Sequence, residues 1–349
     1  MRFRLALAGL LLLLAACGGG DGRAPFVESR IPPTLSPRFW APDGWAWGLL
    51  KVGDAPAQRY GVSSTPITPQ AQILILSGYG ESAETWFETA RDLNARGYGV
   101  WVLERAGQGG SERYALPRDL GHAPSFKDDI QAVKTLARMM EAGSPGTPVI
   151  ILGHSVGGLV ALAAIEQGAP AQGLILSAPA FANRDPVDSS RAGLVKIGLG
   201  RLPAAFGSGW SRNGPDGRGQ GLTGDRWRGA VQKAWQTANP DLRMGGQSLG
   251  WLGAFRETSR AIEPGLAGLE TPTLLLSGGL DRNADAAEQA RVCKAMARCT
   301  LYSFKAAHHA LHLETDAVRL PWLAAVDGFV RTRAGSRAFL IGPTVDHGL

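Results

Sequence analysis

The stretch Gly153-His154-Ser155-Val156-Gly157 places a serine between two glycines, at the point where a strand should give way to a helix. Residues 149–152 form a short apolar run typical of a buried parallel strand. Residues 158–165 are rich in alanine and leucine, which favour a helix. In that setting Gly-x-Ser-x-Gly predicts a nucleophile elbow, a tight turn that exposes the serine hydroxyl. Glycine suits both flanking positions because a Cβ there would meet neighbouring backbone.

The N-terminus indicates export. A basic start with Arg2 and Arg4 precedes the apolar residues 5–14, a run too short to span a bilayer. Leu14-Ala15-Ala16-Cys17 resembles the lipobox of bacterial lipoproteins, in which the cysteine is lipidated. We therefore expect a signal peptide over 1–16 and a lipid anchor on Cys17, with a tether or linker over 17–44. The glycine after Cys17 favours the periplasmic face of the outer membrane; the alternative is an ordinary secretory signal with an incidental cysteine.

Strand-like and helix-like runs alternate from about residue 45, which predicts an α/β fold with a mostly parallel central sheet flanked by helices. The core is expected over 45–181 and 269–335, interrupted by an insertion over 182–268 and followed by a tail over 336–349. The insertion has no comparable strand but carries Trp210, Trp227, Trp235 and Trp251. The expected strands cover 71–76, 98–104, 149–152, 173–177, 273–277 and 301–304. The expected helices cover 81–97, 126–141, 158–165, 286–297 and 320–333.

A serine hydroxyl needs an adjacent base, and that base needs a third group to orient it. Asp281 follows the predicted strand at 273–277, and three histidines follow the next one: His308, His309 and His312. The order serine, acid, histidine is the one expected after such an elbow. We predict Ser155 as nucleophile, Asp281 as orienting acid and His309 as base. The alternatives are His308 as base, and Asp285 or Glu314 as acid.

The region from 309 to 314 resembles the histidine loop of monoacylglycerol lipases and bacterial lysophospholipases, where a glutamate follows the catalytic histidine five positions later. The five-residue spacing from Glu314 selects His309. Ser77-Gly78-Tyr79-Gly80-Glu81 occupies the place of the family's His-Gly-x-Gly-Glu loop, with serine in place of histidine. Residues 103–111 also resemble a loop of the same branch, with Glu104 where the family has aspartate. Over roughly 45–335 the chain is therefore similar to the lysophospholipase and monoacylglycerol lipase branch of the α/β-hydrolases, a serine aminopeptidase-type group.

The resemblance implies a helical cap over 182–268 and an oxyanion hole made by the backbone N–H groups of Tyr79 and Val156. It implies an enzyme that cleaves carboxylic esters of single-acyl-chain lipids through an acyl-enzyme, at a membrane. This chemistry requires no cofactor or metal. Two alternatives stay open: an aminopeptidase-like amide hydrolase, which an acidic subsite in the cap would favour, and a non-catalytic lipoprotein that binds a ligand.

Cys293 and Cys299 lie outside the reducing cytoplasm if the chain is exported, so we expect a disulfide between them, with two buried thiols as the alternative. Neither has a partner at zinc-ligand spacing. Between residues 182 and 260 there are 10 Arg and 2 Lys against 5 Asp and 1 Glu. A basic cap would suit anionic lipid, or is an ordinary solvated surface. The arginines are scattered and no nucleic-acid motif accompanies them, so nucleic acid is not an expected partner. Nothing in the sequence specifies an oligomeric state.

Overall fold

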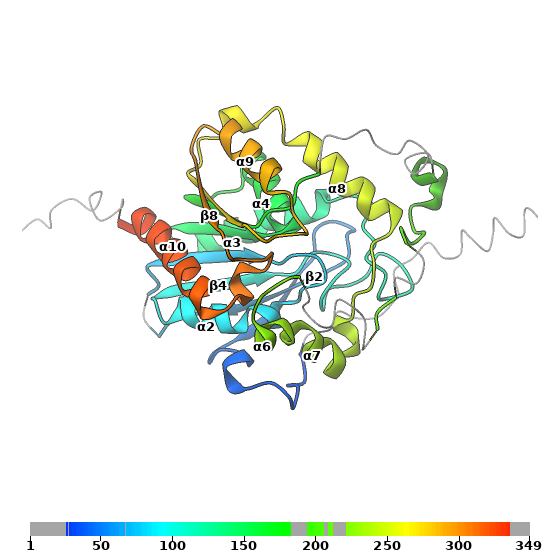
Figure 1. Ribbon diagram of the computed structural model, residues 1–349, viewed down its shortest axis with the longest axis horizontal. Helices are drawn as coiled ribbons and strands as arrows, with labels where there is room; N and C mark the ends of the chain where they lie inside the picture. The colour runs from blue at the N-terminus through cyan, green and yellow to red at the C-terminus, as the bar shows by residue number, and fades with distance from the viewer. Residues whose placement is uncertain are drawn as a thin grey trace, which may run out of the picture.

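The computed structural model describes residues 26, 28–66, 68–182, 194–205, 209–211 and 221–335. Its described strands form one sheet with the order β1-β2-β4-β3-β5-β6-β7-β8 (Figure 1). β1 and β2 are antiparallel additions at one edge, and all the other neighbouring pairs are parallel. The bounds are β1 (Ala46–Leu50), β2 (Gln58–Ser63), β3 (Ala71–Leu76), β4 (Tyr98–Leu103), β5 (Val149–His154), β6 (Gly173–Ser177), β7 (Thr273–Gly278) and β8 (Cys299–Phe304).

Side chains of the parallel strands alternate between two layers of helices, as the pleat of a strand requires. Ile73 and Ile75 pack in one cluster with α2 and α10, while Leu74 and Leu76 pack in the other with α3, α4 and α9. Both faces are buried, which explains the continuous apolar runs in the sequence. The core helices are α2 (Phe87–Asn94), α3 (Lys127–Gly143), α4 (Val156–Glu166), α9 (Ala286–Ala295) and α10 (Asp316–Gly335), with the 3-10 turns η2 (Ala83–Trp86) and η7 (Leu311–Leu313).

The predicted fold class is confirmed, and so are the strands at 71–76 and 173–177. β1 and β2 were not predicted. The sequence of β2, Gln-Arg-Tyr-Gly-Val-Ser, lacks apolar alternation because it buries Arg59, which is 0% exposed. Its guanidinium pairs with Glu84 at 2.9 Å and Glu104 at 2.6 Å, from two other segments. A strand stabilised by distant ion pairs leaves no local pattern to read.

The predicted tether or linker over 17–44 includes residues that pack against the domain. Leu35 and Phe39, the latter in η1 (Pro37–Phe39), are buried in a cluster with Phe87 of α2 and Trp235. Arg30 exchanges two hydrogen bonds with the side chain of Asn239, at 2.7 and 2.9 Å. Isolated apolar residues among prolines give no periodic signal, so this segment resembles a linker although it packs against the domain.

Between β6 and β7 the described residues form helices, which lie on both sides of the edge where the parallel strands end (Figure 1). Val231 and Trp235 pack against Phe87, on the side of α2, and Trp251 and Ala254 pack with α4 on the opposite side. The elements are the π-helical turn η3 (Val195–Leu199), α6 (Arg226–Gly229), α7 (Val231–Ala238), η5 (Pro240–Leu242), α8 (Leu249–Ala261) and η6 (Leu266–Gly268). We keep the name cap for residues 182–268.

Cys293 of α9 and Cys299, the first residue of β8, form a disulfide. Across the part of the chain that the structure describes, no helix has the length and apolar character needed to cross a bilayer. The predicted signal peptide over 1–16, the lipidation site Cys17 and the tail over 336–349 lie outside the described residues.

Candidate active site

Ser155 occupies a strained turn between β5 and α4. Its backbone has φ 54° and ψ −127°, a conformation that costs a non-glycine residue roughly 1–3 kcal/mol. A Cβ on Gly157 would lie 2.4 Å from the carbonyl oxygen of Leu76, and one on Gly153 would lie 2.6 Å from the carbonyl oxygen of Gly157. Both glycines of the motif are therefore required by close backbone packing.

The three residues predicted for catalysis meet in one hydrogen-bonded chain. The hydroxyl of Ser155 lies 2.9 Å from Nε2 of His309, and Nδ1 of His309 lies 2.7 Å from a carboxylate oxygen of Asp281. Asp281 follows β7 and His309 follows β8, both parallel to β5. Parallel strands end at the same edge of a sheet, so residues 154 positions apart in sequence come into contact there.

The alternative acids and histidines are engaged elsewhere. Glu314 binds Nδ1 of His308 at 2.8 Å, and Asp285 accepts the N–H groups of Ala287 and Glu288 at the start of α9. His312 is fully buried and stacks on Trp86, with ring centroids 3.7 Å apart.

Asp281 is held as a carboxylate. Burial would raise its pKa, but the hydrogen bond to His309 and the N–H groups of Asn283 and Ala284 outweigh burial and hold the pKa below its usual range. A charged acid on Nδ1 fixes the tautomer and orientation of the histidine ring, with Nε2 directed at the serine.

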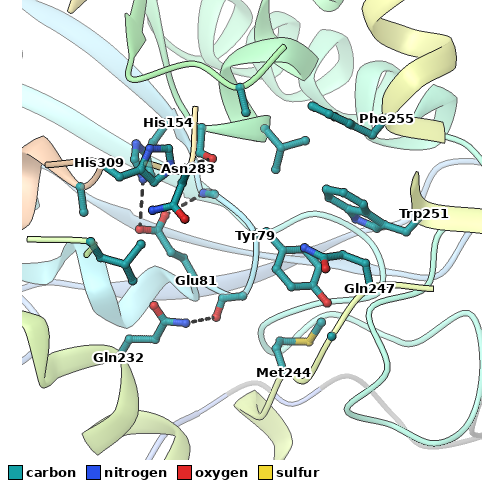
Figure 2. A pocket seen from close by; sticks show the side chains of 18 of the residues that line it. Tyr79, Glu81, His154, Gln232, Met244, Gln247, Trp251, Phe255, Asn283 and His309 are labelled. Atoms are coloured by element: carbon teal, nitrogen blue, oxygen red, sulfur yellow. Dashed lines mark hydrogen bonds and ion pairs between the residues drawn. The ribbon is translucent and has the colours of Figure 1, made fainter. Parts of the chain in front are cut away.

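The loop Ser77–Glu81 lies beside Ser155 and is held by three glutamine side chains. Gln108 donates to the carbonyl oxygen of Gly78 at 2.9 Å. Gln232 and Gln236, both on α7, donate to the carbonyl oxygen of Gly80 at 2.9 and 3.1 Å (Figure 2 shows the first bond). Tyr79, between these two glycines, and Val156, the first residue of α4, both line the cavity at Ser155.

Sequence analysis missed the two glutamines. They lie four positions apart and therefore on one face of a helix. Gln108 lies within the 103–111 stretch that resembles the family loop, although no role was predicted for it. Glu104 of that stretch, one of the residues that depart from the family pattern, accepts the N–H groups of Ala83 and Gly110, each at 2.7 Å.

A cluster of Glu81, His154 and His312 lies beside His309, whose ring centroid is 4.8 Å from that of His154. Their side-chain donor atoms lie within 4.8 Å of one another and are buried, so they could in principle hold a metal ion. Burial lowers the pKa of His154, whose Nδ1 lies 3.0 Å from the carbonyl oxygen of Ser177, and the ring is neutral. Glu81 is committed to the N–H groups of Gly78 and Trp86 and to His312. These contacts give the cluster a packing role under the loop Ser77–Glu81.

A cavity of about 410 Å³ is lined by Ser155 and by residues of the cap, among them Gln232, Met244 and Trp251 (Figure 2 shows the cap side chains). We call it the catalytic cavity. The cap residues that line it, among those described, are all neutral: Leu222, Gln232, Met244, Gly245, Gly246, Gln247, Trp251, Leu252 and Phe255. The core contributes further apolar walls from Val156, Ala180, Ala310 and Leu313.

A basic cap that faces the substrate was one of the two expectations. The described cap residues that line this cavity are neutral instead. Arg228 pairs with Glu88, Asp225 and Asp316. Lys233 and Arg243 both lie over the ring of Trp210, each 4.2 Å from its centroid. Of the four tryptophans, Trp251 lines the cavity, Trp235 is buried and Trp227 is exposed.

A family model described as serine aminopeptidase, S33, matches residues 67–316, which include the elbow, the acid and the histidine. The chain belongs to this family. It is 28% identical over 285 residues to lysophospholipase L2 of Escherichia coli, a match that covers 74% of this chain and 79% of the relative. It is 26% identical over 264 residues to human monoglyceride lipase, covering 72% and 79% of the two chains.

Solved structures agree on the fold. A soluble variant of monoglyceride lipase from Saccharomyces cerevisiae aligns with a TM-score of 0.61 at 18% identity, covering 82% of this chain and 94% of that one. Monoacylglycerol lipase from Paleococcus ferrophilus aligns with a TM-score of 0.60 at 21% identity, covering 78% and 98%. The chain has the α/β-hydrolase fold.

Proposed function

We propose that this protein is a serine hydrolase that cleaves carboxylic esters of single-acyl-chain lipids, of the lysophospholipid or monoacylglycerol type. The observation that carries the proposal is the chain Asp281–His309–Ser155, which opens into a cavity whose described cap walls are neutral. A cavity of this size accommodates an acyl chain, and few polar groups are needed to orient the ester.

In the first half of the reaction Ser155 Oγ attacks the ester carbonyl carbon while His309 takes the hydroxyl proton. The carbonyl oxygen becomes an oxyanion, which accepts hydrogen bonds from the N–H groups of Tyr79 and Val156. As the tetrahedral intermediate collapses, the acyl C–O bond breaks and His309 gives its proton to the departing alcohol. Water then attacks the acyl-enzyme by the same route, releasing the fatty acid and restoring the serine.

The relatives support cleavage of an ester rather than an amide, since they are named lysophospholipase and monoglyceride lipase. A peptidase that removes N-terminal residues would need an anion for the substrate ammonium group. The described cap residues at the cavity carry no charge, and Glu81 at its edge is already committed to Gly78 and His312. The cavity therefore favours a substrate that is neutral near the scissile bond.

We also propose that a lipid on Cys17 holds the enzyme at a membrane, on the periplasmic side. The basic start, the short apolar run and the small residues before Cys17 support export and lipidation. The disulfide between Cys293 and Cys299 is consistent with an oxidising compartment.

The test is labelling with a fluorophosphonate probe, followed by turnover of a lysophospholipid, a monoacylglycerol, a p-nitrophenyl ester and an aminoacyl amide. The wild type should be labelled and Ser155→Ala should not. The exposed Ser64, in the loop after β2, provides a matched control, and Ser64→Ala should label like the wild type.

Equal labelling of the wild type and Ser155→Ala would overturn the nucleophile assignment. A wild type that is not labelled and cleaves no substrate would point to a binding protein. Faster cleavage of the amide than of the esters would point to a peptidase.

A further inference from the structure

A second cavity, of about 560 Å³, lies directly beside the catalytic cavity. The two share four lining residues: Ala180, Leu252, Phe255 and Asn283. We call the second one the side cavity. It lies between α8, the segment after β6 and the loop that joins β7 to α9. A substrate whose ester lies at Ser155 can therefore extend past Phe255 and Asn283 into it.

The side cavity differs from the catalytic cavity in its charge. Two arginines line it, Arg256 on α8 and Arg282 directly after Asp281. Neither arginine forms an ion pair or a side-chain hydrogen bond with any residue that the structure describes. By contrast, Arg291 of α9 is paired with Glu263 and Glu288.

Two carboxylates also line the side cavity, those of Asp281 and Asp285, and neither forms an ion pair with the two arginines. The side chain of Asp281 is only 1% exposed and bonds to His309. Asp285 has one carboxylate oxygen occupied by the first N–H groups of α9. Two arginines without an ion-pair partner among the described residues, in a cavity that adjoins the one at Ser155, suit a ligand with an anionic group beyond the ester.

We propose that Arg256 and Arg282 bind the phosphate in the alcohol portion of the substrate. This inference rests on the proposed function and narrows it from single-chain lipid esters in general to those with a phosphate-bearing head group. The acyl chain occupies the catalytic cavity, the ester lies at Ser155, and the glycerol phosphate extends into the side cavity. A guanidinium group suits phosphate because its N–H donors match two phosphate oxygens at once.

The test compares two esters with the same short acyl chain, both used as monomers: a lysophospholipid and a monoacylglycerol. Each is assayed with the wild type, with the double variant Arg256→Gln/Arg282→Gln, and with Arg260→Gln. Arg260 is exposed on the same helix and lines neither cavity, so it controls for a general loss of positive charge.

For the double variant, kcat/KM on the lysophospholipid should fall by about tenfold or more, the size expected when hydrogen bonds to a charged group are lost. The monoacylglycerol should be cleaved as before, and Arg260→Gln should change neither reaction. Glycerol 3-phosphate should inhibit the wild type, and should do so more weakly in the double variant. An equal effect of inorganic phosphate would show that the site recognises phosphate alone rather than a glycerol phosphate head group.

An unchanged lysophospholipid reaction, or an equal loss on both esters, would overturn the assignment of the two arginines. In either case the monoacylglycerol reaction of the wild type still reports on the proposed function. Failure of the wild type on both esters would instead overturn the proposed function.

Discussion

The carboxylate of Glu314 lies 2.8 Å from Nδ1 of His308 and accepts the backbone N–H of the same residue at 2.7 Å. This pair turns the ring of His308 away from the nucleophile, and the adjacent His309 is the one that faces Ser155. Glu314 therefore stabilises the histidine loop and is not the acid that binds His309. Its sequence position alone was compatible with either role.

Replacing each histidine separately should separate their roles. His309→Ala should lower kcat by about 10⁶-fold, because the serine then has no base. His308→Ala should leave kcat within about tenfold of the wild type, since it removes a loop contact and no reacting group. Steady-state hydrolysis of a p-nitrophenyl ester measures both, and a larger loss in His308→Ala would contradict the assignment.

Gln232 and Gln236 should affect the chemical step through the loop that carries Tyr79. Both donate to the carbonyl oxygen of Gly80, so the double change to alanine should lower kcat by about tenfold with a smaller effect on KM. Gln131→Ala on α3, whose side chain donates to Thr135 on its own helix, is the matched control. A rise in KM with unchanged kcat would indicate a substrate contact instead.

Glu166 should make the protein less stable as pH rises. Burial, with a contribution from Glu263, raises its pKa from 4.5 to about 7, and its Oε1 makes no hydrogen bond to a described residue. A raised folded-state pKa means that the folded state holds the proton more tightly, so stability is lost as pH rises from about 4.5 through about 7.

Glu166→Gln should abolish this loss of stability with rising pH. At pH 8 the variant should be more stable than the wild type by about 1 kcal/mol, or roughly 2–4 °C in Tm. Near pH 4 the difference should vanish, because the wild-type side chain is then neutral. Thermal unfolding at both pH values measures this, with exposed Glu141→Gln as the control. A variant that is less stable at pH 8 would show that the Glu166 charge is compensated.

The disulfide should stabilise the end of α9 against β8. Replacing Cys293 and Cys299 together by alanine should lower the free energy of unfolding by about 2 kcal/mol, the entropy-based value for a loop of this length. Denaturant unfolding of the two proteins measures the difference, and intact mass with and without reductant verifies the bond. Esterase activity at low temperature should be unchanged, because neither cysteine lines the catalytic cavity.

The features of this site that depend on residues close together in the sequence could be predicted. The elbow depends on two glycines that flank Ser155 between an apolar strand and a helix, and all of those residues are contiguous. The order of Ser155, Asp281 and His309 could be predicted because parallel strands end at one edge of the sheet. The choice of His309 over His308 came from resemblance, and the hydrogen bond to Ser155 agrees with it.

Other features depended on contacts between distant segments. β2 buries Arg59, which is compatible with a strand only because Glu84 and Glu104 come from elsewhere to meet its charge. The 28–44 segment packs through Leu35 and Phe39 against α2 and α7, and neither residue carries a periodic signal.

The sequence by itself determined the elbow at Ser155, the chain order of Ser155, Asp281 and His309 and the sheet that presents them, since these follow from short-range geometry and strand polarity. Only the tertiary structure decided which charges of the cap remain available. Ten arginines between residues 182 and 260 suggested a basic lid, yet Arg228 is paired and the described cap lining of the catalytic cavity is neutral. A charge acts on a substrate only where folding leaves it without a partner, and that depends on which residues meet in space.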